Sequence, residues 1–250
     1  MNKLILSSLT IFLLASCSNN EAKFAEEDGL NVFNADSLKK HIAVLASDDF
    51  MGRKPFTEGE TKTVAYLQEQ FKQMGLEPGN GESYIQDVPM ANILATAAPS
   101  MQVKSAKGSF NLKAFDDYII WTDKTDSSIS LNEAELVFAG YGVVAPEYNW
   151  NDYAGLDVKG KVVMVMVNDP GFWIGDTSLF KGKAMTYYGR WTYKFEEAAR
   201  QGAKGCLIIH NTAAASYPFS VVQNSFNTTR LKLDNRGKNI PNCDVIGWVP

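Results

Sequence analysis

The chain has 250 residues, a formal net charge of −4 and no cluster of lysine or arginine, which argues against a nucleic-acid partner. Apolar residues make up 45% of the chain and aromatic residues 12%, enough to fill the core of one large domain or two small ones. Only three cysteines are present, which is sparse for a protein that depends on disulfides.

The first residues have the three-part layout of a secretory signal: a short positive start, an apolar run over Leu4–Leu14, and Leu-Ala-Ser-Cys at residues 14–17. The apolar run is shorter than the stretch of about 20 residues that a membrane-spanning helix requires. The last four residues resemble the bacterial lipobox, which implies lipidation of Cys17. We therefore expect a signal peptide over 1–16, a lipidated tether over 17–29, and an exported, membrane-anchored lipoprotein of the periplasm or outer membrane. The alternative is an ordinary signal peptide with an incidental cysteine.

Two helices are predicted in the first folded part of the chain. Asn34 or Asp36 can cap a short amphipathic helix that ends near Ala46. A second helix has a capping-box pattern over Thr57–Glu60 and ends at Gly75, which suits a left-handed stop. One apolar stripe on this second helix is formed by Val64, Leu67, Phe71 and Met74.

The remainder of the chain alternates strands with helical pattern, which predicts an α/β fold. Short strand-like runs extend from Tyr84 to about Tyr118, and a polar loop or linker follows over 123–130. A helix begins near Trp191 and is ended by Gly202. Longer apolar runs predict further strands, buried where the run is continuous. These runs cover residues 136–139, 162–167, 205–210 and 244–249.

No complete catalytic constellation is found, because the G-x-S-x-G, Walker, C-x-x-C and H-E-x-x-H motifs are all absent. His41 lies in the first helix and is expected to be a partly buried helix residue. His210 ends a predicted strand, where it is either a structural residue or a ligand or base. It cannot share a metal with Cys206 on the same strand, because four strand residues span roughly 13 Å and zinc ligands lie about 2 Å from the ion.

Two further groups of polar residues leave alternatives open. Asp48 and Asp49 precede Arg53 in a loop, where they either form turn caps and an ion pair, or hold a cation or position a charged substrate group. Cys206 and Cys243 are either a disulfide, which an oxidising compartment permits, or two separately buried thiols.

An aromatic group precedes and enters the helix that begins near Trp191. Helical spacing explains Trp191 and Phe195 as core residues. Tyr187 and Tyr188 come before the helix and are not explained in this way, so they are candidates for lining a ligand cleft.

Several segments, taken in order, resemble extracytoplasmic zinc aminopeptidases of the superfamily that includes glutamate carboxypeptidase and the transferrin receptor. The opening of that family is matched by residues 45–53, by the helix over 57–76 with Gly75-Leu76-Glu77-Pro78, and by Tyr84-Ile85-Gln86. The family's inserted protease-associated domain is matched by residues 138–143, 153, 155–163, 187–196 and 198–203.

The resemblance implies an incomplete zinc-peptidase α/β domain with an inserted β-rich domain. It divides the chain into the N-terminal part of a peptidase domain over 30–130, a protease-associated domain over 133–235, and a returning peptidase strand over 240–250. In related enzymes the insert borders the substrate cleft, so the segment Asp169–Tyr188 is our candidate for a cleft-facing surface.

The resemblance also implies a reaction: removal of N-terminal residues from peptides by two zinc ions in the complete enzyme. The family's ligands begin with a His-x-Asp segment that would follow Pro250, so no catalytic or metal residue can be assigned in this sequence, and no zinc is expected on this chain alone. One interpretation is the front portion of such an aminopeptidase, with a peptide substrate and a membrane anchor. The other is a complete, non-catalytic lipid-anchored module that binds peptides or proteins.

Overall fold

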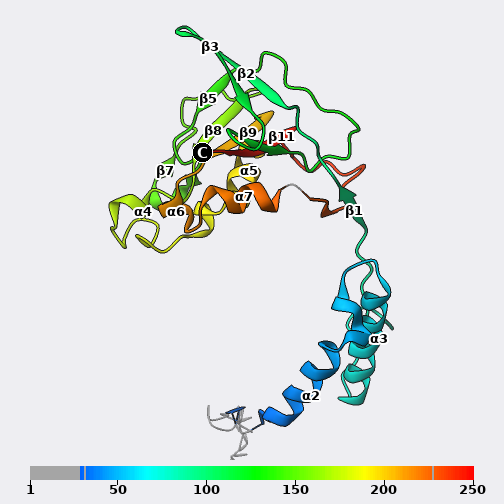
Figure 1. The fold of residues 1–250 in the computed structure, drawn as a ribbon. Helices are drawn as coiled ribbons and strands as arrows, with labels where there is room; N and C mark the ends of the chain where they lie inside the picture. The colour runs from blue at the N-terminus through cyan, green and yellow to red at the C-terminus, as the bar shows by residue number, and fades with distance from the viewer. Residues whose placement is uncertain (1–28, 31, 227) are drawn as a thin grey trace, which may run out of the picture. The chain divides into compact units, whose positions relative to one another are not determined.

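The structure is a computed structural model that describes residues 29–30, 32–226 and 228–250. The chain divides into two units, one ending at Asp87 and the other covering Val88–Pro250 (Figure 1). Cys17 lies outside the described residues, as do the predicted signal peptide and nearly all of the tether, so these assignments stay predictions. No helix within the described ranges is both long and apolar enough to cross a bilayer.

The first unit contains both predicted helices, α2 (Ala35–Leu45) and α3 (Glu58–Gln73), with the 3-10 helix η1 (Asp48–Arg53) between them. Asn34 caps α2, because its side-chain oxygen accepts hydrogen bonds from two N–H groups of the first turn, both at 2.9 Å. The prediction that α2 ends near Ala46 is confirmed, since that residue is the C-cap.

The two ends of α3 were predicted with different success. Gly75 ends the helix with a left-handed φ of 72°, as predicted. The capping box is wrong in detail. The Thr57 hydroxyl donates to the carbonyl of Lys54 at 2.6 Å instead of accepting a helix N–H, and Glu60 accepts the N–H of Phe56 at 2.5 Å. The Thr57 hydroxyl is used by the preceding turn and is therefore not available to cap α3.

The apolar stripe of α3 lies largely at the surface. Leu67, Phe71 and Met74 are exposed, and Gly59 is the one buried residue among those described before Val88. An apolar stripe is normally covered by a neighbouring element. The helices described in this unit leave it uncovered.

The loop carboxylates of the first unit form no ion pair with Arg53 among the described residues. Asp48 and Asp49 are exposed at the start of η1, and the Arg53 guanidinium donates to the carbonyl of Leu45 instead. The predicted ion pair is therefore wrong, because the Arg53 side chain of η1 is hydrogen-bonded to the last residue of α2.

The second unit is built on a five-stranded sheet with the strand order β4-β11-β9-β8-β5. The four strands from β11 to β5 are parallel, and β4 pairs antiparallel with β11 at one edge. The predicted α/β class and the four predicted apolar strands are thereby confirmed. In chain order the strands are β4 (Ile119–Trp121), β5 (Leu136–Phe138), β8 (Val162–Met166), β9 (Gly205–Ile209) and β11 (Val245–Val249).

Smaller elements complete this unit. The antiparallel pairs are β1 (Met90–Ile93) with β10 (Arg230–Leu233), β2 (Ser100–Ser105) with β3 (Gly108–Lys113), and β6 (Val144–Ala145) with β7 (Trp150–Asn151). The helices are α4 (Gly171–Ile174), α5 (Trp191–Arg200), α6 (Thr212–Ala215) and α7 (Phe219–Ser225), with 3-10 turns η2 (Pro146–Tyr148) and η3 (Tyr187–Gly189).

The main core lies between the sheet and the helices α5, α6 and α7, which cover one of its faces (Figure 1). Val163, Val165 and Ile208 of the sheet are fully buried and belong to the same cluster as Ala198 of α5 and Trp248 of β11. The continuous apolar runs read from the sequence are explained by this burial.

All three predicted segments of the chain contribute to the same sheet. β4 comes from 30–130, β5, β8 and β9 come from 133–235, and β11 comes from 240–250. The strand β11 pairs with β9 over five residue pairs. The assignment of 133–235 as a β-rich protease-associated domain stays a prediction.

Candidate functional site

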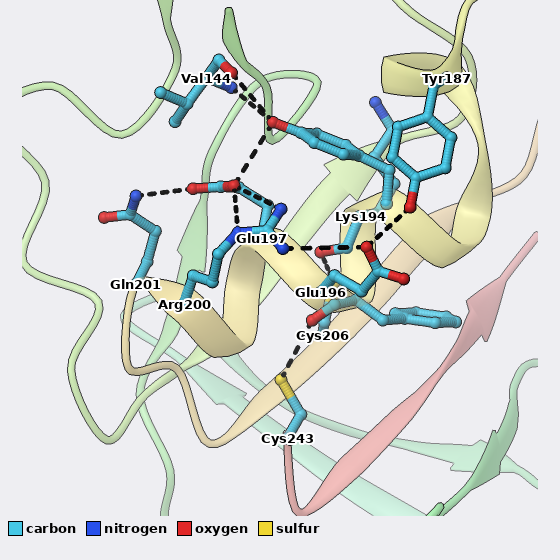
Figure 2. A network of polar contacts seen from close by, with 11 residues as sticks. Val144, Tyr187, Lys194, Glu196, Glu197, Arg200, Gln201, Cys206 and Cys243 are labelled. Carbon is cyan, nitrogen blue, oxygen red and sulfur yellow. Dashed lines mark hydrogen bonds and ion pairs between the residues drawn. The ribbon is translucent and has the colours of Figure 1, made fainter. Parts of the chain in front are cut away.

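The helix α5 carries the polar and aromatic residues that form the candidate site. Its apolar face packs on β9, and its N-terminal turn follows η3, where the candidate residues Tyr187 and Tyr188 lie. Figure 2 shows the polar contacts made around this helix. The helix ends as predicted, with Gln201 as C-cap and Gly202 at a φ of 80°.

A cleft of about 160 Å³ lies beside the first two turns of α5. Trp191 and Phe195 of α5 contribute its aromatic wall, with their ring centroids 5.9 Å apart. A cavity of roughly 150 Å³ is large enough to hold a benzene molecule, so this cleft can accept one side chain. The lining residues are Asp123, Trp191, Thr192, Phe195, Glu196, Lys232, Asn242, Cys243 and Ile246.

Two charged residues that line the cleft, Asp123 and Lys232, form ion pairs. The Asp123 carboxylate forms an ion pair with Lys232 Nζ at 2.7 Å and lies 3.7 Å from the guanidinium of Arg230. That guanidinium is stacked over the ring of Trp121, 4.6 Å from its centroid. Burial lowers the pKa of Arg230, and the charge of Asp123 opposes this shift.

Tyr187 is hydrogen-bonded to Glu196, which lines the cleft. The phenol O–H donates to Glu196 Oε2 at 2.8 Å, and the Arg200 guanidinium lies 3.8 Å from the same oxygen (Figure 2). The hydrogen bond to Glu196 raises the pKa of Tyr187. Tyr187 is 57% exposed, so its ring is accessible beside the cleft while its hydroxyl orients a lining carboxylate.

Tyr188 makes different contacts. Its O–H donates to Glu147 Oε1 at 2.7 Å, which raises the pKa of Tyr188 to about 12. Its ring packs edge-on against Phe180 and Tyr193, with centroid distances of 5.7 and 5.0 Å. The structure therefore separates the two candidate tyrosines: only Tyr187 contacts a residue of the cleft.

The segment Asp169–Tyr188, predicted to face a cleft, is anchored at its base and at its centre. Asp169 is completely buried, and its Oδ2 accepts hydrogen bonds from the N–H and hydroxyl of Thr186 at 2.9 and 2.8 Å. Phe180 is also completely buried. Between these anchors, Trp173 and Ile174 of α4 are exposed.

Two buried charged residues of α5 were not predicted. Glu197 accepts hydrogen bonds from Arg200 and Gln201 at 2.9 and 2.8 Å, and Tyr193 Oη lies 3.4 Å from it (Figure 2). Lys194 is completely buried. The helical spacing could have indicated that Lys194 is buried, because position 194 lies on the same helix face as Trp191.

The histidines have structural partners. His41 Nδ1 of α2 lies 2.7 Å from Tyr66 Oη, and the imidazole is half-buried, as predicted. His210 Nε2 lies 3.0 Å from the carbonyl of Tyr217, and its ring packs against Trp248. Burial lowers the pKa of His210. Within the described part of the chain, no three His, Cys, Asp or Glu side chains gather closely enough to hold a metal ion.

The cysteines of the second unit are free thiols. Cys206 and Cys243 are both buried, and no disulfide joins them. Cys243 lines the cleft and its thiol lies 3.6 Å from the carbonyl of Ala203. Of the two interpretations of these cysteines, separately buried thiols are the one seen in the structure.

Comparisons with known proteins give little support to any assignment. No protein-family model matches the chain, and no curated protein matches it. A solved structure that it resembles is an aminopeptidase from Aneurinibacillus sp. strain AM-1, with a TM-score of 0.34 and 21% identity over 71% of this chain. The chain spans 32% of the length of that aminopeptidase. A likeness this distant does not by itself imply a shared activity.

Proposed function

We propose that this chain is the N-terminal part of a lipid-anchored, extracytoplasmic zinc aminopeptidase, and that the cleft beside α5 contacts the peptide substrate. The proposal is supported by the ordered sequence segments that resemble this family. The observation that carries it is the position of Tyr187 and Glu196 beside a cleft large enough for one side chain. A carboxylate in a cleft with an aromatic wall suits a peptide with a free amino group.

The described residues do not fit a two-zinc site, since no group of three metal-binding side chains occurs among them. We therefore derive no catalytic step for these residues. The ligands are proposed to follow Pro250. The role proposed for the described residues is to bind and orient a peptide.

A non-catalytic peptide-binding module is the second candidate. The same cleft supports it, because binding at Glu196 requires no metal. The two candidates differ in the peptide they prefer. An exopeptidase subsite recognises a free N-terminus, whereas a binding module accepts an internal segment of a peptide.

Calorimetry with a tripeptide and its N-acetylated form tests this proposal on the full chain. We expect binding of the free peptide, weaker binding of the acetylated form, and a several-fold loss with Glu196→Gln. The matched control is Glu133→Gln, an exposed glutamate of the same unit. Equal affinities for both peptides would favour the binding module, and no binding by either would refute a peptide site. Uptake of two zinc equivalents with peptide hydrolysis by this chain would contradict the proposed position of the ligands.

The anchor is tested separately. We expect wild-type protein in its native host to incorporate labelled fatty acid and to sediment with membranes. Cys17→Ser should abolish both. Unchanged membrane retention of the variant would argue against lipidation at Cys17.

A further inference from the structure

Lys194 is a buried lysine without a hydrogen-bond partner. It lies in the middle of α5 on the face toward the sheet, with a side chain that is 0% exposed. Its Nζ accepts or donates no hydrogen bond within the described structure. A buried ammonium that is neither hydrated nor paired is strongly disfavoured, so this position needs an explanation.

Three groups act electrostatically on Lys194, each from a different element. Asp152 follows β7, Asp169 follows β8, and Cys206 lies on β9. No ion pair within 4.0 Å joins Lys194 to either carboxylate in the described part of the chain. Burial holds the Cys206 thiol neutral by raising its pKa well above the usual value.

Asp152 and Asp169 are both engaged elsewhere. Asp152 Oδ2 accepts the N–H groups of Tyr141 and Val143 at 3.1 and 3.0 Å. Asp169 uses Oδ2 for Thr186, while its Oδ1 is buried and has no partner among the described residues. The region therefore contains an unpaired amine and an unpaired carboxylate oxygen that are held apart by the packing around them.

Desolvation is the dominant effect on Lys194 and lowers its pKa to about 7, although Asp152 and Asp169 oppose the shift. The side chain is therefore neutral in mildly alkaline solution and gains a proton near neutral pH. A neutral amine tolerates a dry environment, whereas the ammonium requires water or a paired carboxylate.

The segment Asp169–Gly189 begins with Asp169, one of the charged groups that act on Lys194. It contains the single-turn helix α4 and two consecutive non-glycine residues with positive φ, Phe180 at 49° and Lys181 at 59°. Residues in this conformation store strain, which offsets part of the stabilisation that the buried Asp169 and Phe180 give to the closed segment. The sheet and α5, by contrast, are held by regular backbone hydrogen bonds along their length.

We propose that Lys194 is a proton-controlled switch for the segment Asp169–Gly189: the neutral amine keeps the segment closed, and the ammonium opens it to admit water. The open state gives the ammonium its hydration and gives Asp169 Oδ1 a partner. Because the segment carries Trp173, Ile174 and Tyr187, the switch would change the exposure of these side chains, and Tyr187 contacts Glu196 of the cleft. This inference does not depend on the proposed function.

Hydrogen–deuterium exchange of the full chain at several pH values, corrected for the intrinsic pH dependence of exchange, tests the switch. In wild-type protein the opening of residues 170–188 should increase at least about tenfold from pH 9 to pH 7 and level off below pH 7, since each unit of pKa difference changes the equilibrium by about a factor of ten. The amides of β8 and β9 should show no such change.

Lys194→Met should make the opening independent of pH, because methionine retains an apolar stem and cannot gain a proton. Lys183→Met, a substitution of an exposed lysine within the same segment, should behave as wild type. The same pH profile in Lys194→Met, or a flat profile in wild-type protein, would overturn the proposal.

A second variant keeps the test decisive if Lys194→Met does not fold. Asp169→Asn retains an oxygen for Thr186 but removes a charge that favours the ammonium. The pH at which opening levels off should therefore fall below that of wild type. An unchanged levelling-off point would contradict the coupling between the two side chains.

Discussion

Tyr187 and Glu196 lie on η3 and α5, nine positions apart, and are joined by a hydrogen bond of 2.8 Å from the phenol O–H to Oε2. The neighbouring Tyr188 donates to Glu147 instead, at 2.7 Å. Two consecutive tyrosines thus orient two different carboxylates, and only the first of these belongs to the cleft. This pair allows the role of the cleft to be tested with matched substitutions.

We expect Tyr187→Phe to weaken peptide binding by about 1 kcal/mol, the usual net contribution of one hydrogen bond. Glu196 would lose the donor that orients it. Stability should change by less than about 0.5 kcal/mol, because the side chain is largely exposed. Tyr188→Phe is the control and should leave affinity unchanged. Calorimetry with the same tripeptide measures both, and equal losses in the two variants would contradict a specific role for Tyr187.

The closure of the segment Asp169–Gly189 gives a second prediction. Thr186→Val removes the hydroxyl that donates to the buried Asp169 carboxylate at 2.8 Å. A hydrogen bond to a charged group contributes about 1.5–3 kcal/mol, so the unfolding free energy should fall by about that amount. Thr177→Val, an exposed position in the same segment, should cost little.

Urea denaturation followed by tryptophan fluorescence measures this change. All tryptophans lie after Val88, so the signal reports the second unit alone. Equal midpoints for Thr186→Val and wild-type protein would show that the Asp169 contact does not stabilise the closed segment.

Much of the fold could be predicted from local pattern. The strands β8 and β9 are continuous apolar runs, and α3 and α5 combine a helical period with a glycine stop. These signals are local, so they are visible without knowledge of the tertiary structure. The same holds for Asn34, whose cap depends only on the next few residues.

The rest of the fold and the cleft could not be predicted, because they depend on contacts between residues that are distant in the sequence. The strand β4 has only three residues, and its partner β11 lies more than 100 positions later. The helices α4 and α6 have a single turn each, too short for a periodic signal. The cleft combines Asp123, Glu196 and Lys232 from three separate segments, and no spacing in the sequence shows that they meet.

The two buried thiols give a third prediction. Burial raises the pKa of Cys243 to about 12, and that of Cys206 well above its usual value. At pH 8 the thiolate fraction of Cys243 is roughly one part in ten thousand, so labelling of the folded protein should be very slow. In a Cys17→Ser background, both thiols should react rapidly in urea. A native mass two units lower than that of the reduced chain would reveal a disulfide and contradict the structure.

The edge of the sheet gives the last prediction. A Cβ atom at Gly247 of β11 would lie 2.2 Å from the carbonyl oxygen of Ile119 and 2.8 Å from Ile120 Cγ2. Gly247→Ala should therefore force β4 away from β11 and lower stability by about 1–3 kcal/mol, as overpacking does. Ile120→Ala in the same chain should not restore stability, because the closer obstacle is backbone. Urea denaturation followed by fluorescence measures the loss of stability, and hydrogen–deuterium exchange of the β4 amides measures the displacement of β4. A full rescue by Ile120→Ala would show that the Ile120 side chain excludes a Cβ at this position, and not the close approach of the two strands.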